Sequence, residues 1–235
     1  KIPNKKVPVH TKEERARLQK AFGYTYEDFK TSILPMALNG SEQIGAMGID
    51  TPLAVLSNNH QPLFNYFKQL FAQVTNPPID SIREKVVTST TVYLGSDGNV
   101  LEEKPENCKQ LRINNPILTN TDILKIKNMK VDGFKVETIP IIYYKNTSLE
   151  KAIDHLYVEA DRAHREGANI IILSDRGVDE NHVAIPSLLA VSALQQYLVQ
   201  TKKRTSMAVI LESGEPRDVH HFATLLGFGA SAINP

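Results

Sequence analysis

Hydrophobic and polar residues change their spacing along this chain, and the change falls near residue 129. Beyond that point, short apolar runs rich in β-branched residues alternate with amphipathic segments that carry helix-capping signals. The runs predict strands, and the segments between them predict helices at the spacing of parallel crossovers. The expected strands are 135–144, 169–174, 207–211 and 230–233; the expected helices are 147–167, 186–200 and 216–226, with Gly227 as the last cap.

This alternation predicts the fold class. We expect an α/β protein with a mostly parallel sheet, built by a C-terminal (βα)3β run similar to part of a β/α barrel; doubly wound sheets contain such runs as well. The run 169–174, NIIILS, is apolar throughout, as expected of a parallel strand covered on both faces. The chain then divides into a linker or arm at 1–10, a mainly helical part at 11–128 and the parallel β/α part at 129–235.

The N-terminal part carries local helix signals. Thr11 and Glu14 form a capping box for a helix that ends near residues 22–23, and a second helix starts at Thr25 with Pro35 inside it. The remaining expectations are a short strand or extended segment at 52–57, a strand at 92–94, a polar loop at 105–115, and a short helix within 116–128 capped by Thr119 or Thr121.

Residues 62–84 carry the most distinctive pattern of the chain. Apolar residues recur at helical spacing over 62–74, which predicts a helix buried along one stripe: Leu63, Phe67, Leu70, Phe71 and Val74. Asn76-Pro77-Pro78 stops this helix, because neither proline donates a backbone hydrogen bond. Ser81 and Glu84 match a second capping box, which predicts a helix from about Ile82. From the residues alone, the rigid corner 75–80 is a helix–helix connection.

Composition narrows the function classes. The chain has 235 residues, 41% hydrophobic and 23% charged, with a net charge of +1, so nothing points to nucleic acid or a membrane surface as partner. No apolar run approaches the roughly 18 residues of a membrane span, and the basic start lacks a signal-peptide core. The single cysteine, Cys108, excludes an internal disulfide and a cysteine-ligated iron–sulfur cluster, and it fits a reducing, cytoplasmic compartment.

Two residues stand where β/α folds place functional loops. Asp175 and Arg176 directly follow the strand at 169–174, which makes them a candidate binding site. The alternative is that they orient the connection to the next helix.

The histidines give weaker signals. His220 and His221 are adjacent, but adjacent helical residues point about 100° apart. The expected inward stripe is Val219, Phe222, Ala223 and Leu226, which leaves His221 facing outward. Asp161 and His164 share a helical face without a second such pair, so we expect a solvated surface. We therefore assign no catalytic, cofactor-binding or metal-binding residue.

Long blocks of the chain resemble the central domain of the glutamate synthase large (alpha) subunit. The blocks are QKAFGYTYEDF at 19–29, MGIDTPLAVLS at 47–57, the stretch through TNPPID at 52–84, SDRGVDENHVAIPSLLAVSA at 174–193 and GEPRDVHHFATLLGFGASAINP at 214–235. They follow the family's order, and only about the first ten residues and the region 96–135 match loosely.

The resemblance implies a connecting role without catalysis of its own. In this family an amidotransferase domain releases ammonia from glutamine, and a tunnel leads it to an FMN-binding β/α barrel, where an iron–sulfur cluster helps to deliver electrons. Thr75 and Asn76 match the family residues that border the tunnel. The expected partners are the flanking amidotransferase and FMN-binding domains of the same polypeptide, with ammonia in transit, no cofactor in this chain, and a border with the FMN-binding domain after residue 235. The alternative is a free-standing β/α enzyme with a site at Asp175 and Arg176.

Overall fold

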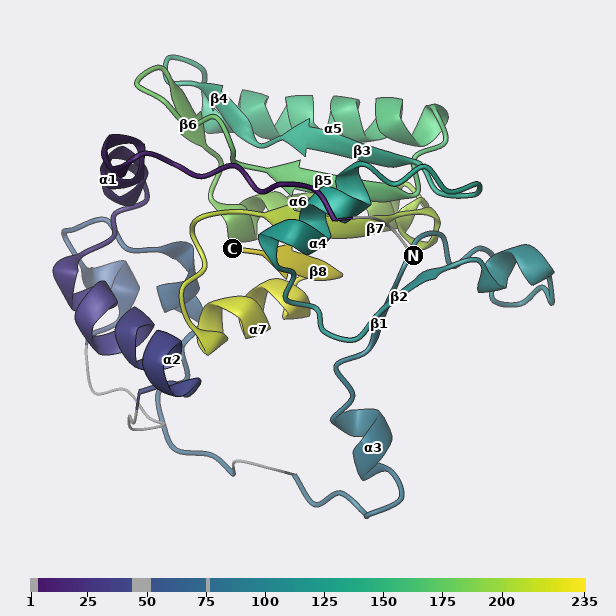
Figure 1. Cartoon of the computed structure of the whole chain (residues 1–235), viewed down its shortest axis with the longest axis horizontal. Coiled ribbons are helices and arrows are strands. Elements are labelled where there is room, and N and C mark those ends of the chain that lie inside the picture. Colours follow the sequence, from purple (N-terminus) through teal and green to yellow (C-terminus); the bar gives the residue numbers. More distant parts are fainter. Residues whose placement is uncertain (1–3, 44–51, 75–76) are drawn as a thin grey trace.

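A four-stranded parallel sheet forms the centre of the protein (Figure 1). The computed structural model describes residues 4–43, 52–74 and 77–235. The strands are β3 (Val136–Pro140), β5 (Ile170–Ser174), β7 (Ala208–Glu212) and β8 (Ala232–Asn234), paired in that order. Every residue of β5 and β7 is buried, which confirms the expectation that apolar runs form strands covered on both faces.

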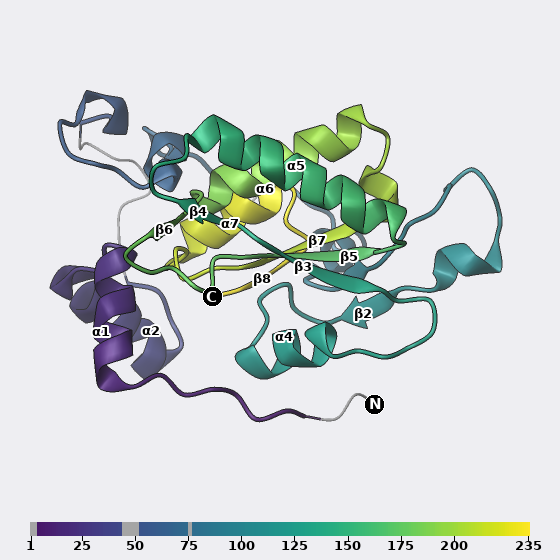
Figure 2. The same cartoon turned by 90° about the horizontal axis from the view of Figure 1, so that it is seen from above.

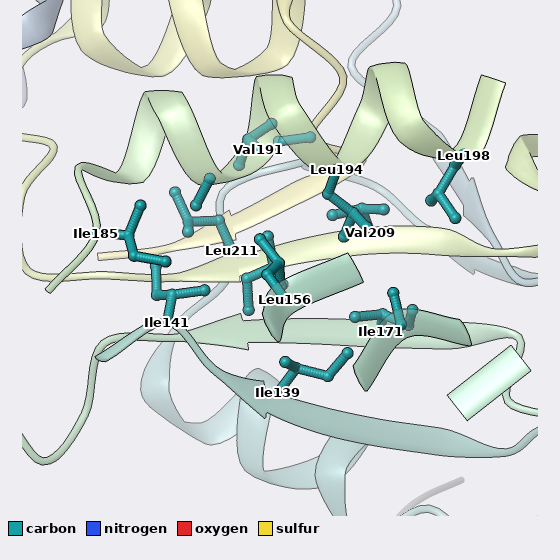
Figure 3. Packing of buried hydrophobic residues seen from close by; sticks show 14 of the residues in the cluster. Ile139, Ile141, Leu156, Ile171, Ile185, Val191, Leu194, Leu198, Val209 and Leu211 are labelled. Atoms are coloured by element: carbon teal, nitrogen blue, oxygen red, sulfur yellow. The ribbon is translucent and has the colours of Figure 1, made fainter. Parts of the chain in front are cut away.

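Helices cover the two faces of the sheet unequally. The helices α5 (Leu149–Arg165), α6 (Ser187–Gln200) and α7 (Val219–Gly227) lie on one face, and α4 (Asn120–Lys127) lies on the other (Figure 2). The alternation of side chains along β5 divides the core accordingly: Ile171 and Leu173 pack with α5 and α6, as Figure 3 shows for Ile171, whereas Ile170 and Ile172 pack on the α4 side.

The strand expected at 135–144 is two strands in different sheets. After β3 ends at Pro140, β4 (Ile142–Tyr144) leaves the parallel sheet and pairs antiparallel with β6 (His182–Ala184). The loop expected at 105–115 is also wrong in part, because it contains a 3-10 turn and β2 (Leu111–Ile113), which pairs antiparallel with β1 (Val92–Leu94). The four strands of the central sheet are parallel, as expected.

Capping side chains fix the helix starts close to the predicted positions. Thr119 caps α4 within a capping box, as one of the two expected alternatives. For α5 the cap is Ser148 and not Thr147, and for α7 it is Asp218. At the end of α7 the left-handed residue is Gly229, with a φ of 118°, so Gly227 is not the cap.

The N-terminal part begins with two helical segments. Thr11 and Glu14 form the predicted capping box of α1 (Lys12–Ala21). The second segment follows Thr25 as a π-helical stretch, Asp28–Ile33, that continues into α2 (Leu34–Asn39) with Pro35 in its first turn. At 52–57 the extended segment is replaced by a 3-10 turn, Ala54–Leu56.

The long helix expected over 62–74 is not formed. Only a 3-10 turn, Leu63–Phe67, is helical, and its buried residue is Phe64. Phe67, Leu70, Phe71 and Val74 of the predicted stripe are 47–79% exposed. The prediction of a second capping box at Ser81 and Glu84 is also wrong, because α3 (Glu84–Val87) starts two residues later than expected. The Asp80 carboxylate accepts instead from the N–H groups of Ile82 and Arg83.

An earlier segment closes one edge of the sheet. Leu118 N donates to Ile233 O and Ile233 N donates to Pro116 O, each at 2.7 Å, so residues 116–118 lie parallel to β8. No helix within the described residues is long and apolar enough to cross a membrane.

Candidate functional site

Polar residues gather where the parallel strands end. Seven polar or charged residues of the described chain are buried, and six of them lie at or next to the strand ends or at the start of α6: Ser174, Asp175, Glu212, Ser213, Asn234 and Ser187. Because functional loops of β/α folds usually follow the carboxyl ends of their strands, this cluster is the candidate site.

Glu212, the last residue of β7, is the centre of an ion-pair network. Lys127 Nζ lies 2.7 Å from both oxygens of the Glu212 carboxylate, whose side chain is 6% exposed. The Ser174 hydroxyl donates to the same carboxylate, and Arg176 Nε lies 3.9 Å from it. The buried negative charge is thus balanced from α4 and from the end of β5.

Asn234 joins this network to the start of α4. Its side-chain amide donates to Leu118 O at 2.9 Å and to Asn120 Oδ1 at 3.0 Å. Its oxygen accepts from the Arg176 guanidinium at 3.4 Å. Arg176 therefore contacts the ends of β7 and β8.

Asp175 contacts a different part of the site. Its carboxylate accepts from Gly214 N at 3.1 Å and from the Ser213 hydroxyl, and both partners belong to the turn between β7 and α7. Burial raises the pKa of Asp175 to about 6, although Ser213, Arg176 and Gly214 favour the charged form. Asp175 and Arg176, adjacent in sequence, thus bind separate partners.

Carboxylates occupy the starts of two helices at this edge. Glu215 accepts from Ser187 N at 2.7 Å and from the Ser187 hydroxyl at 2.5 Å, at the first turn of α6. Asp218 accepts from His221 N at 3.0 Å at the start of α7. Negative side chains thus hold the positions where a helix N-terminus would receive an anionic ligand.

The segment that leads to α2 covers the β7–α7 turn. Arg217 donates to the Phe22 carbonyl and to Asp28 Oδ2, the latter at 3.0 Å, and its guanidinium carbon lies 4.0 Å from the Tyr24 ring centre. The Tyr24 hydroxyl donates to Gly214 O at 2.8 Å. Sequence reasoning missed this contact, because it joins residues about 190 positions apart; the arginine directly before the Asp218 cap is the only local signal.

His221 faces inward, contrary to expectation. It is 7% exposed, its ring stacks on Phe64 with 4.3 Å between centroids, and its Nδ1 accepts from Arg217 N at 3.0 Å. Burial lowers the pKa of His221 to about 4. Val219, placed on the inward stripe, is 57% exposed instead, and the apolar residue of α7 that is fully buried is Leu225.

The other sequence candidates do not form a site with these residues. Asp161 Oδ1 lies 2.6 Å from Lys203 Nζ, and its other oxygen accepts from the Tyr197 hydroxyl, which ties α5 to α6. No group of three metal-ligating side chains occurs among the described residues. Cys108 is an exposed free thiol. Thr75 and Asn76 lie outside the described residues.

The fold and this site define a class of protein: a parallel α/β domain whose strand-end polar groups bind one another and the segments that cover them. Comparison with known sequences identifies the family. The family model of the glutamate synthase central domain matches residues 17–235, and the chain belongs to this family.

Relatives from distant organisms agree with this assignment. The chain is 46% identical over 217 residues to the glutamate synthase [NADPH] large chain of Bacillus subtilis and 44% identical over 220 residues to the glutamate synthase [NADH] of Schizosaccharomyces pombe. It is 44% identical over 230 residues to the ferredoxin-dependent glutamate synthase of Cyanidium caldarium. These matches cover 92–95% of this chain but only 10–15% of each relative.

Proposed function

We propose that this chain is the connecting domain of a glutamate synthase, linking a glutamine amidotransferase domain to an FMN-binding synthase domain of the same polypeptide. In the overall reaction, water hydrolyses glutamine to one glutamate and ammonia. The ammonia adds to 2-oxoglutarate with loss of water, and two electrons and two protons reduce the resulting imine to the second glutamate. The observation that carries the proposal is the family match over residues 17–235, in a chain that spans about a seventh of the Bacillus relative.

The strand-end contacts support a role without catalysis in this chain. A catalytic group needs a free side that faces substrate, with a pKa suited to proton transfer. The Glu212 carboxylate is instead held by Lys127 and Ser174, and Glu215 is held at the start of α6. Asp175 has a pKa near neutrality but is 3% exposed and lies beneath the β7–α7 turn. These contacts also weigh against the alternative, a free-standing enzyme with its site at Asp175 and Arg176.

The strand-end residues of this chain do not suit the binding of FMN or of an iron–sulfur cluster, the cofactors of the glutamate synthase reaction. FMN carries a phosphate, and the carboxylates of Glu215 and Asp218 at the starts of α6 and α7 would repel it. A cysteine-ligated cluster needs several thiolates, and the chain has one cysteine. We therefore assign FMN and the iron–sulfur cluster to other parts of the polypeptide and derive no step through them here.

An exposed apolar run supports contact with neighbouring domains. Large apolar residues that are half or more exposed recur between residues 55 and 87: Val55, Leu56, Tyr66, Leu70, Phe71, Val74, Ile82, Val86 and Val87. Soluble monomers rarely expose so much apolar surface together, and such surfaces mark interaction sites. We propose the flanking amidotransferase and FMN-binding domains as its partners.

The corner 75–80 lies within this run. We propose that Thr75 and Asn76 border the tunnel through which ammonia passes between the two active sites. Pro77 and Pro78 restrict the backbone on one side of this pair and donate no hydrogen bonds themselves. A stiff polar lining of this kind would let neutral ammonia pass while the apolar surroundings exclude bulk water. We also propose a cytoplasmic location, which suits the free thiol of Cys108.

The test uses the full-length polypeptide that carries this chain. Purified enzyme is assayed for glutamate formation from glutamine and 2-oxoglutarate with NADPH, NADH and reduced ferredoxin in turn, because the printed names of the relatives include all three donors. No glutamate formation with any donor would overturn the proposal.

A substitution at the corner tests the tunnel. Thr75→Trp should lower glutamine-dependent glutamate formation. Glutamine hydrolysis should either continue without matching synthesis, which raises the glutamine hydrolysed per 2-oxoglutarate consumed, or be suppressed together with synthesis. Synthesis from added ammonia should fall less, because that route does not need the tunnel. A folded variant with an unchanged ratio and rate would show that the corner is only a structural turn.

A further inference from the structure

Helix α7 packs on the chain before the corner and lines a hollow with the chain after it. Before the corner, the turn Leu63–Phe67 packs on α7 and α6, and the Phe67 ring meets the edge of Phe228 at 5.1 Å between centroids. After the corner, Ser89 and Thr90 line a hollow of about 440 Å³ together with Leu226 and Gly229, which also lie at the C-terminal end of α7. The chain thus meets the C-terminal end of α7 through Phe67 before the corner, and it lies near the same end after the corner.

Residues 77–88, which follow Asn76, project away from the sheet. Figure 1 shows residues 77–88, including α3, extending well clear of the β-sheet. The hydrogen bonds of this stretch join its own residues, such as Asp80 with Arg83 and Thr88 with Glu84. The position of the stretch therefore depends strongly on how its ends are held.

The contact before the corner has a defined geometry. His220 Nε2 lies 2.9 Å from the Phe64 carbonyl oxygen, and since a carbonyl accepts, the imidazole donates from Nε2. The Phe64 ring is fully buried and stacks on His221 with an interplanar angle of 18°. His221 in turn accepts from Arg217 N. Phe64 is therefore held by the hydrogen bond from His220 to its backbone carbonyl and by the stack of its ring on His221.

We propose that His220 is a positioning residue for the transfer between the two active sites. By holding the Phe64 carbonyl it fixes where the chain leaves α7 and enters the corner. This inference rests on the proposed function, and it assigns His220 no contact with ammonia or with either substrate. The contact is separable from folding, because His220 is half-buried and its bond can be removed while the Phe64–His221 stack remains.

The first experiment measures position, in the full-length polypeptide. His220→Ala should speed amide hydrogen exchange in peptides covering residues 63–74, whereas His220→Gln, whose amide N–H can replace the Nε2 donor, should restore the slow exchange. His155→Ala, at an exposed histidine of α5, is the matched control and should leave these peptides unchanged. Equal exchange in the His220→Ala variant and wild type would overturn the proposal.

The second experiment measures coupling in the same variants. His220→Ala should raise the glutamine hydrolysed per 2-oxoglutarate consumed by roughly two- to thirtyfold, with the KM for glutamine unchanged, and His220→Gln should return it towards wild type. If wild type forms no glutamate, the proposed function fails. If wild type is coupled and a folded His220→Ala variant is equally coupled, the positioning role alone fails.

Discussion

The ring of His221 lies nearly parallel to that of Phe64, 4.3 Å away, although 157 positions separate the two residues in the chain (221 minus 64). Phe64 is fully buried at this contact, whereas Phe67, one turn later, is 47% exposed. The apolar pattern of the segment is therefore divided between the core of the domain and its surface.

Two alanine variants test this division. Phe64→Ala should cost roughly 3–5 kcal/mol of unfolding free energy, as expected for a fully buried phenylalanine. Phe67→Ala should cost about 1 kcal/mol, the value of an aromatic edge contact, because nearly half of its side chain is already exposed. Urea denaturation measures both. Equal losses for the two variants would contradict the assignment of Phe64 as the anchor.

Acid should weaken the contact through His221. Burial lowers the pKa of His221 to about 4, so the folded state holds the neutral ring while the unfolded chain titrates near 6.5. This contribution is fully present above pH 6.5 and is lost as the pH falls through about 4. Denaturation at several pH values should show this loss in wild type and a flatter dependence in His221→Asn. Asn retains an acceptor for Arg217 N, so it is the matched variant. A histidine NMR titration of His221 near pH 6.5 would contradict the expectation.

Asp175 should have the opposite pH dependence. Burial raises the pKa of Asp175 to about 6, so its favourable contribution is present below pH 3.8 and is lost as the pH rises through 6. Asp175→Asn removes this charge and keeps an acceptor for Gly214 N. The variant should therefore gain stability relative to wild type between pH 4 and pH 7, by on the order of 2–3 kcal/mol. A difference between the two proteins that does not change with pH would exclude this titration.

The Lys127–Glu212 pair can be measured with a double-mutant cycle. Lys127→Met leaves the buried Glu212 carboxylate without its nearest cation and should cost roughly 3–5 kcal/mol. Adding Glu212→Gln removes the unpaired charge, so the double variant should recover most of that loss. Urea denaturation of the four proteins gives the coupling energy. Additive effects would mean that Arg176, 3.9 Å away, replaces Lys127 as the partner.

The parallel part could be predicted because its signals are local and agree with one another. The run 169–174 is long, apolar and β-branched; Gly167 ends the helix before it, and Pro186 opens the helix after it. The split of 135–144 was not predictable from pattern. The apolar character continues through Pro140, and only the distant β6 decides where residues 142–144 pair.

The prediction of a helix before the corner was wrong for a different reason. Residues 63–74 match a buried helical stripe in spacing, but Phe64, which lies off that stripe, is the residue that enters the core. Leu63 is half-buried against the core, and residues 66–74 are exposed. Periodicity reports which residues are apolar and not what covers them. For Asp175 the expected place at the strand end is correct, whereas its burial depends on Tyr24 and the β7–α7 turn, which no local signal joins.

The Arg217 contacts have a consequence for the order in which the chain folds during synthesis. Phe22 leaves the ribosome 195 residues before Arg217, the residue that binds its carbonyl. At about 5–20 residues per second, that delay is roughly 10 to 40 s. During this delay, the first two helices and Phe64 lack the β7–α7 surface on which they pack in the folded protein. The nascent chain therefore exposes these aromatic side chains until the β7–α7 turn emerges, and exposed apolar groups of this kind favour aggregation during folding.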